Sequence, residues 1–184
     1  MLSNKLHKNL YEVRNAKCEV LTKNNVILGI DPGSTVIGYG LITYQSKGIK
    51  PRALDYGYID LKSYRKQEQK LLHLNQDLKE ILKKYKPKYI AVEKIFFFKN
   101  AKTFIAVSEA KGVILLTAAE AEIDIYEYTP LQVKQTISGY GKADKKLIEK
   151  LIQSSLDICS SIKPDDSSDA LAIALCHYHH LINV

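Results

Sequence analysis

The chain contains 184 residues, of which 46% are hydrophobic and 26% charged, and its formal net charge at pH 7 is +7. This length suits one domain with a substantial core and is short for two. No apolar run approaches the roughly 20 residues that span a bilayer, and no signal-like segment precedes the first apolar strand. We therefore expect a cytoplasmic protein without a membrane partner.

The three cysteines, Cys18, Cys159 and Cys176, are scattered without a short C-x-x-C spacing. They indicate neither a disulfide framework nor a zinc site. We expect them to be buried and reduced.

Positive charge is concentrated in one part of the chain. Residues 62–111 contain thirteen Lys or Arg against five Asp or Glu, a local excess of eight, while the rest is nearly neutral. A basic block on a small domain fits a polyanion partner such as nucleic acid. Solvated lysines on ordinary helices are the commoner explanation of any single cluster.

The chain opens with a polar extension, residues 1–25, and we place the domain at residues 26–184. An apolar strand begins at Val26, ends at Asp31 and turns at Pro32-Gly33. Two further extended segments follow it and suggest an antiparallel arrangement. The three predicted strands are 26–31, 37–42 and 53–61.

Helical periodicity begins after the third strand, where apolar residues recur at intervals of three and four. Pro87 ends this first helix, and apolar strands then alternate with helical patterns. The remaining predicted elements are helix 65–85, strand 88–93, helix 100–120, strand 123–128, and helices 131–137, 143–156 and 165–181. This order indicates an α/β fold in which helices flank a mixed five-stranded sheet.

Two carboxylates stand at the ends of apolar strands. Asp31 ends the first strand and Glu93 the fourth. Taken alone, an aspartate before Pro-Gly is usually a turn former. An uncompensated charge beside an apolar core is costly, however, so each acid needs a cation or another protein charge beside it.

The last predicted helix begins with more acids. Asp165 lies in the first turn, where a negative charge favours the helix dipole. Asp169 lies one turn further in, directly before an apolar stretch, and Asp166 shares its face at i−3. Helical geometry alone could equally choose Asp165, which lies four residues before Asp169.

Carboxylate oxygens without His or Cys ligands select hard cations such as Mg²⁺ or Mn²⁺. Two such ions can activate water and stabilise the leaving oxygen in phosphodiester hydrolysis. A site formed by Asp31, Glu93 and the acids of the last helix therefore predicts metal-dependent cleavage of a phosphodiester.

Four ordered segments resemble the bacterial RuvC Holliday-junction resolvases, which are crossover junction endodeoxyribonucleases. The resemblance runs from about Val26 to His180, and the first segment alone also resembles the phosphate loops of actin-like ATPases. The segments are 27–34 with Gly38-Tyr39-Gly40, 92–96 with Lys99-Asn100-Ala101, 132–136, and 166–174.

The resemblance implies a ribonuclease H-like fold and a homodimer in which each subunit nicks one strand of a four-way DNA junction, at symmetric positions. It implies two Mg²⁺ ions per active site, with Mn²⁺ as a substitute, and the RuvAB branch-migration complex as a partner. Asp31, Glu93, Asp166 and Asp169 match the four metal-binding catalytic acids of the family, so the family spacing favours Asp166 over Asp165.

DNA-binding residues are also implied by the resemblance. Phe96 aligns with the aromatic residue that wedges at the junction centre, although a triple Phe is most often core, and Phe97 and Phe98 stay undecided. Lys134 and Lys145 align as phosphate contacts.

Two other groups near the end of the chain have simpler interpretations. The segment 139–141, Gly-Tyr-Gly, is either a hinge or a loop that orders on DNA. His177, His179 and His180 form no HExxH motif, so we expect a histidine cluster at the surface or helix end rather than a metal site.

Together these patterns predict a structure-selective DNA endonuclease that resolves Holliday junctions in homologous recombination and DNA repair. The alternatives are a related ribonuclease H-like nuclease acting on RNA, an actin-like ATPase, and an inactive junction-binding module. Incubation with Mg²⁺, ATP, a four-way junction and a linear duplex separates these hypotheses.

Overall fold

The computed structural model describes residues 25–45, 49–95 and 101–182. Within these ranges the predicted helices and strands are confirmed, with ends that differ by at most two residues. The boundary expected after residue 25 lies at the edge of the described part and stays a prediction. The elements are β1 (Val26–Asp31), β2 (Val36–Thr43), β3 (Arg52–Asp60), α1 (Gln67–Tyr85), β4 (Tyr89–Glu93), α2 (Ala101–Glu120), β5 (Asp124–Tyr128), α3 (Pro130–Ser138), α4 (Lys145–Leu156) and α5 (Asp165–Ile182).

The five strands form one mixed sheet in the order β3-β2-β1-β4-β5. β1, β2 and β3 pair antiparallel as a meander, whereas β4 lies parallel to β1, and β5 lies parallel to β4. Parallel neighbours need a long crossover connection, and α1 and α2 supply it on one face of the sheet. The mixed five-stranded sheet flanked by helices is thus confirmed.

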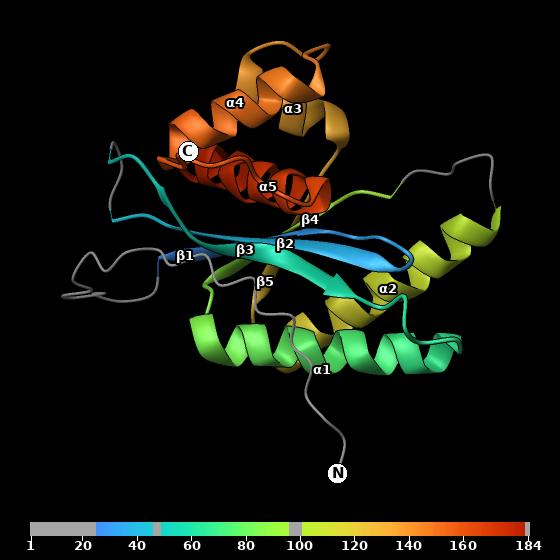
Figure 1. Ribbon diagram of the computed structural model, residues 1–184. Coiled ribbons are helices and arrows are strands. Elements are labelled where there is room, and N and C mark those ends of the chain that lie inside the picture. Colours follow the sequence, from blue (N-terminus) through green and yellow to red (C-terminus); the bar gives the residue numbers. More distant parts are fainter. Residues whose placement is uncertain (1–24, 46–48, 96–100, 183–184) are drawn as a thin grey trace.

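Helices cover both faces of this sheet (Figure 1). α1 and α2 lie on one face, and α3, α4 and α5 lie on the other, with α5 directly against the strands. Alternate residues of β1 separate the two cores: Leu28 and Ile30 pack toward α1 and α2, and Ile27 packs toward α5. This alternation follows from the two-residue period of a strand.

Local sequence explains the ends of the helices. α1 buries Leu74, Leu78 and Leu82 and ends at Tyr85. Lys86 caps it with a left-handed φ of 47°, just before Pro87. α3 begins with a capping box between Thr129 and Gln132, which satisfies two backbone N–H groups at the helix start.

The expectation that the cysteines are buried holds for Cys176 and is wrong for Cys159, which is exposed; Cys18 lies outside the described residues. Cys159 follows the end of α4, where the chain crosses the surface to α5. None of the helices in the described ranges has the length and apolar character needed to cross a bilayer.

Candidate active site at the carboxyl edge of the sheet

Asp31 and Glu93 end neighbouring parallel strands. The register pairs Ile30 of β1 with Val92 of β4, so the two acids follow side by side at the same edge. Ala91, two residues before Glu93, packs in the core beneath α5, as does Ile27 of β1. Because strand side chains alternate, both carboxylates belong to the face that α5 covers.

α5 approaches this face closely because three strand positions are glycine. A Cβ at Gly29 would lie 2.1 Å from the carbonyl oxygen of Ala170, and one at Gly40 would lie 2.7 Å from the amide nitrogen of Leu171. No side chain fits at such distances. Glycines within apolar strands are the sequence signal for this close contact.

The third glycine positions the start of α5 beside Asp31. Gly38 pairs with Asp31 across β1 and β2, and a Cβ on Gly38 would lie 2.1 Å from the Asp166 carbonyl oxygen. The backbone of Asp166 therefore lies over the strand next to Asp31. Asp169 follows one helical turn later.

The charges of these acids act on one another. Burial, and to a lesser degree repulsion from Glu93, Asp169 and Asp166, raise the pKa of Asp31 to about 7, although attraction to Lys145 acts in the opposite direction. Burial and then repulsion from Asp169 raise the pKa of Glu93. Like charges disfavour ionisation when they are close and partly desolvated, so the four acids form one electrostatic cluster.

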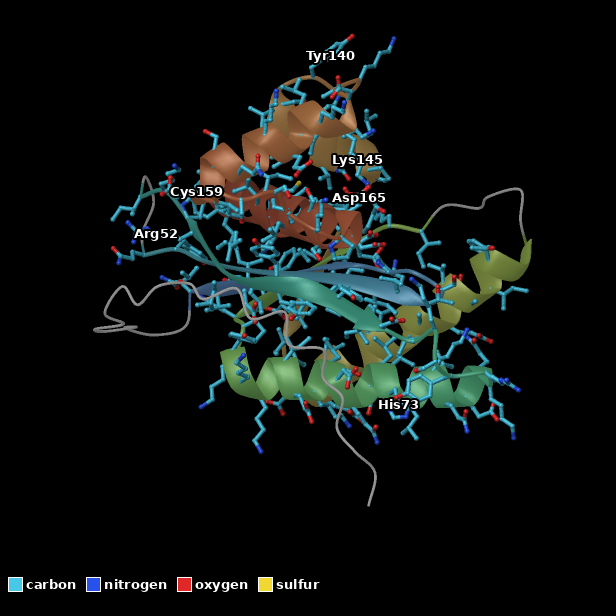
Figure 2. All side chains as sticks on the ribbon, in the orientation of Figure 1. Arg52, His73, Tyr140, Lys145, Cys159 and Asp165 are labelled. Atoms are coloured by element: carbon cyan, nitrogen blue, oxygen red, sulfur yellow. The ribbon has the colours of Figure 1, made fainter. Side chains whose placement is uncertain are left out.

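Two lysines balance part of this negative charge. Lys145 Nζ, at the start of α4, lies 3.2 Å from Asp169 Oδ2 and 3.2 Å from Asp165 Oδ2. Figure 2 shows Lys145 and Asp165 near each other at the beginning of α5. Lys134 of α3 lowers the pKa of Glu93 by attraction, against the larger effect of burial. Both lysines predicted from the resemblance therefore act on the acid cluster.

The four acids offer only carboxylate oxygens, which are the ligands that hard cations such as Mg²⁺ prefer. The side chains are not drawn together into a coordination sphere. Within residues 25–45, 49–95 and 101–182, no three His, Cys, Asp or Glu side chains stand close enough to hold a metal ion.

Comparison with known proteins connects this site to a family. The family described as crossover junction endodeoxyribonuclease RuvC matches residues 27–177. The chain belongs to the RuvC family. A relative named RuvC from Caldicellulosiruptor saccharolyticus is 49% identical over 151 residues, which are 82% of this chain and 90% of that protein.

Solved structures agree with this membership. RuvC of T. thermophilus in complex with a Holliday junction substrate has a TM-score of 0.82 and 30% identity, over 87% of this chain and 96% of that one. A second structure of Thermus thermophilus RuvC has a TM-score of 0.78 and 32% identity, over 85% and 95%.

These matches confirm the predicted RuvC family and the ribonuclease H-like fold. They also confirm the predicted enzyme class, a crossover junction endodeoxyribonuclease. They do not favour the ATPase or the RNA nuclease.

Phe96, for which we predicted a DNA contact, lies outside the described residues together with Phe97 and Phe98. Their roles stay predictions.

The expectation of a histidine cluster at the surface or helix end holds for His179 and His180, which lie in the last turn of α5, and is wrong for His177. His177 is fully buried rather than at the surface, and its Nδ1 lies 2.7 Å from the hydroxyl of Tyr128. Burial, together with a smaller repulsion from His180, lowers the pKa of His177 to about 4. The spacing from Ala170 and Ala174, which face the sheet, was the sequence signal that could have predicted its burial.

A cavity of about 320 Å³ lies beside this cluster, between β5, α3 and the second half of α5. None of the four acids lines it, so it is separate from the candidate active site. Its lining consists of Tyr128, Gln132, Gln135, Thr136, Cys176, His179 and His180.

Proposed function

We propose that this RuvC family member resolves Holliday junctions as a homodimer in the cytoplasm, during homologous recombination and DNA repair. Each subunit nicks one of two strands of like polarity, and the two nicks lie at symmetric positions. The RuvAB branch-migration complex is the proposed partner. Support comes from the family match over residues 27–177 and from the likeness to a RuvC bound to a Holliday junction substrate.

The proposed metal ligands are Asp31, Glu93, Asp166 and Asp169, which hold two Mg²⁺ ions, with Mn²⁺ as a substitute. When bound, such ions lower the pKa of water and stabilise the leaving oxygen of the phosphodiester. Asp31 and Glu93 are fixed by the sheet, whereas Asp166 and Asp169 belong to the helix that rests on it. Rigid elements on both sides of the site suit a reaction that depends on positioning.

The neighbouring cationic and aromatic residues hold the DNA in this proposal. Lys134 and Lys145 contact phosphates beside the scissile bond; Lys145, which pairs with Asp169 at 3.2 Å, would be free for a DNA contact if a bound cation took over that carboxylate. Phe96 stacks on an unpaired base at the junction centre. Contacts to phosphates release counterions, so binding weakens steeply as salt rises.

The observation that carries the proposal is the meeting of acids from separate parts of the sequence at one edge of the sheet. Asp31 and Glu93 end neighbouring parallel strands, and the backbone of Asp166 lies over Gly38, the partner of Asp31 in the sheet. The raised pKa of Asp31 agrees with this placement. Four acids that repel one another are costly to a fold unless a ligand neutralises them. A divalent cation over a DNA phosphate provides that neutralisation.

A nicking assay tests this function. The protein is incubated with a mobile four-way junction or a linear duplex, each with and without Mg²⁺, and ATP hydrolysis is followed in parallel. We expect paired symmetric nicks on the junction only, with Mg²⁺ and without ATP turnover. Asp169→Asn should abolish nicking and keep junction binding, while Asp124→Asn, an exposed acid at the start of β5, should cleave normally. Normal cleavage by Asp169→Asn contradicts the ligand assignment.

α2 offers a surface for the second subunit of the proposed homodimer. Ile105 is 56% exposed and Leu116 57%, and a Cβ on Gly112 would meet nothing within 4 Å. At about 100° per residue these three positions lie within about 40° of one another around the helix. They face away from Ile114 and Ala118, which pack in the core. An apolar stripe centred on a glycine lets two copies of a helix approach closely.

The oligomeric state tests this surface. Leu116→Glu places a charge in the stripe and should convert the dimer to a monomer, as measured by light scattering during gel filtration. Leu72→Glu is a matched control, since Leu72 on α1 is 54% exposed and lies outside the stripe. A Leu116→Glu protein that stays dimeric contradicts the assignment. Paired nicking should fall with dimer content, because one subunit carries one site.

A further inference from the structure

The turn between α3 and α4 fixes the backbone around Tyr140. Gly139 ends α3 with a left-handed φ of 69°, and its N–H donates to the carbonyl of Gln135 at 2.8 Å. Ser138 Oγ lies 3.1 Å from Tyr140 N and 2.6 Å from Tyr140 O. Ala143 N donates to Tyr140 O at 3.2 Å. The backbone is therefore held from both sides of the tyrosine.

The same turn rests against α3. A Cβ on Gly141 would lie 2.6 Å from Leu131 Cδ1 and 3.2 Å from Gln135 Cγ. A side chain at residue 141 would therefore displace the exposed side chain of Leu131. Gly139 and Gly141 thus flank Tyr140 and let the chain turn tightly enough to present it at the tip.

The Tyr140 side chain points into solvent from this fixed turn. It is 61% exposed, more than any other large apolar side chain among the described residues, and Figure 2 shows it at the tip beyond α3 and α4. Core packing does not explain a ring in this position. Exposed tyrosines held on rigid backbone are typical of binding surfaces, because the ring offers a large contact area at little cost in conformational entropy.

The surroundings of Tyr140 are positively charged. Residues 134–146 contain four lysines, all exposed, and one acid, a net charge of +3. The acid, Asp144, caps α4 by accepting the N–H of Leu147 at 2.8 Å. Two of the lysines, Lys134 and Lys145, act directly on the acid cluster. The turn is therefore a cationic surface that borders the candidate active site and carries one exposed aromatic ring.

We propose that Tyr140 stacks on an unpaired nucleobase of the bound junction, close to the strand that is cut. The proposal rests on the proposed function and adds to it a second aromatic contact, on a different segment from Phe96. Flat aromatic rings beside lysines bind single-stranded or unstacked nucleotides, since every base offers a π face and the lysines hold the backbone. Tyr140 is a binding residue here and takes no part in bond cleavage.

A tryptophan reporter tests the contact directly, because the chain contains no tryptophan. Tyr140→Trp creates a single-tryptophan protein whose emission is followed while a four-way junction is added in EDTA, so that the DNA is not cut. Labelled-DNA anisotropy measures binding in the same samples. We expect strong quenching of the tryptophan at saturating junction, and little quenching by linear duplex at equal occupancy.

Leu72→Trp is the matched reporter on α1, on the other face of the sheet, and its emission should stay unchanged. Unchanged emission of Tyr140→Trp at full occupancy overturns the proposal. Equal quenching by duplex also overturns it, because the ring would then touch a paired arm rather than an unpaired base. Both results leave the proposed function intact, since junction nicking by the wild-type protein is measured separately.

Conservative and truncating variants provide a second test. Tyr140→Ala should weaken junction binding about tenfold, the loss expected for one base–aromatic stack, and leave the salt dependence of binding unchanged. Tyr140→Phe should bind like the wild-type protein, because stacking needs the ring and not the hydroxyl. A Phe variant as weak as the Ala variant contradicts stacking. Lys142→Gln, by contrast, should reduce the salt dependence.

Discussion

Asp31 and Gly38 face each other across β1 and β2, and the backbone of Asp166 rests on Gly38. One strand pair thus positions an acid from the sheet and an acid from α5 within electrostatic reach of each other. The missing side chain at Gly38 is what permits this approach. The geometry of the candidate site therefore depends on a residue that carries no functional group.

Gly38→Ala should disrupt the site while every acid is kept. The new Cβ would lie 2.1 Å from the Asp166 carbonyl oxygen, so the start of α5 must move. We expect a loss of about 1–3 kcal/mol in the free energy of unfolding. Junction nicking should fall by about a hundredfold, since a shift of about 1 Å costs that much in a positioned site.

Gly57→Ala on β3 is the control for this variant. Its Cβ would meet the Tyr39 side chain, with the nearest atom, the hydroxyl, at 2.8 Å, and a side-chain end can move where a backbone cannot. Urea unfolding and the nicking rate measure both variants. Equal losses in the two proteins would show that close packing of α5 on Gly38 has no special importance.

Much of the fold could be predicted from the sequence because its signals are local. The apolar strand before Asp31, the Pro-Gly turn and the helical period of α1 each depend on neighbouring residues only. Glu93 could be assigned to a strand end for the same reason. The family motifs then related these separate segments to one site.

Other features depend on contacts between distant segments and were missed for that reason. The spacing of His177 from Ala170 and Ala174 places it on the buried face of α5, but its contacts with Tyr89, Tyr126 and Tyr128 depend on β4 and β5. The ion pairs of Lys145 with Asp165 and Asp169 join α4 to α5 across a turn. Sequence spacing therefore identified candidate site residues, whereas the contacts between them depend on how distant elements pack.

Asp31→Asn should stabilise the metal-free protein at neutral and alkaline pH. The folded protein raises the pKa of Asp31 to about 7, above its ordinary value of 3.8, so ionisation costs stability as the pH rises from about 4 through 7. An amide removes this cost. The melting temperature at pH 8 in EDTA should rise by roughly 2–4 °C for each kcal/mol gained.

This gain should shrink as the pH is lowered toward 4.5, because Asp31 is then protonated in the folded protein. Added Mg²⁺ should stabilise the wild-type protein and have less effect on the variant, which lacks a proposed ligand. Asp124→Asn is the surface control. An Asp31→Asn protein that melts below the wild-type protein at pH 8 contradicts the electrostatic origin of the pKa shift.

Asp165→Asn and Asp166→Asn should separate the two adjacent acids of α5. Asp166 contributes to the raised pKa of Asp31, whereas Asp165 is mostly exposed and pairs with Lys145. We expect Asp166→Asn to lower the nicking rate by at least about a hundredfold and Asp165→Asn by less than about threefold, since an exposed ion pair contributes little. Single-turnover cleavage of a labelled junction measures both. The reverse order would mean that Asp165 is the ligand.

His177 should make the stability of the protein fall as the solution becomes acidic. Burial lowers its pKa to about 4 in the folded protein, against an ordinary value of 6.5, so the unfolded chain binds the proton more tightly. The stabilising effect is complete above pH 6.5 and is lost as the pH falls from 6.5 toward 4. His177→Phe keeps the ring but removes this titration and the Tyr128 contact.

The difference in unfolding free energy between the wild-type protein and His177→Phe should therefore shrink between pH 7.5 and pH 5, measured by urea unfolding in EDTA. Asp31 titrates over part of this range in both proteins and cancels in the comparison. His73→Phe on α1, where His73 stacks on Tyr64 on the other face of the sheet, is the control for the loss of an imidazole away from β5. A pH-independent difference for His177→Phe would mean that the imidazole titrates alike in the folded and unfolded chain, despite its full burial beside Tyr126 and Tyr128.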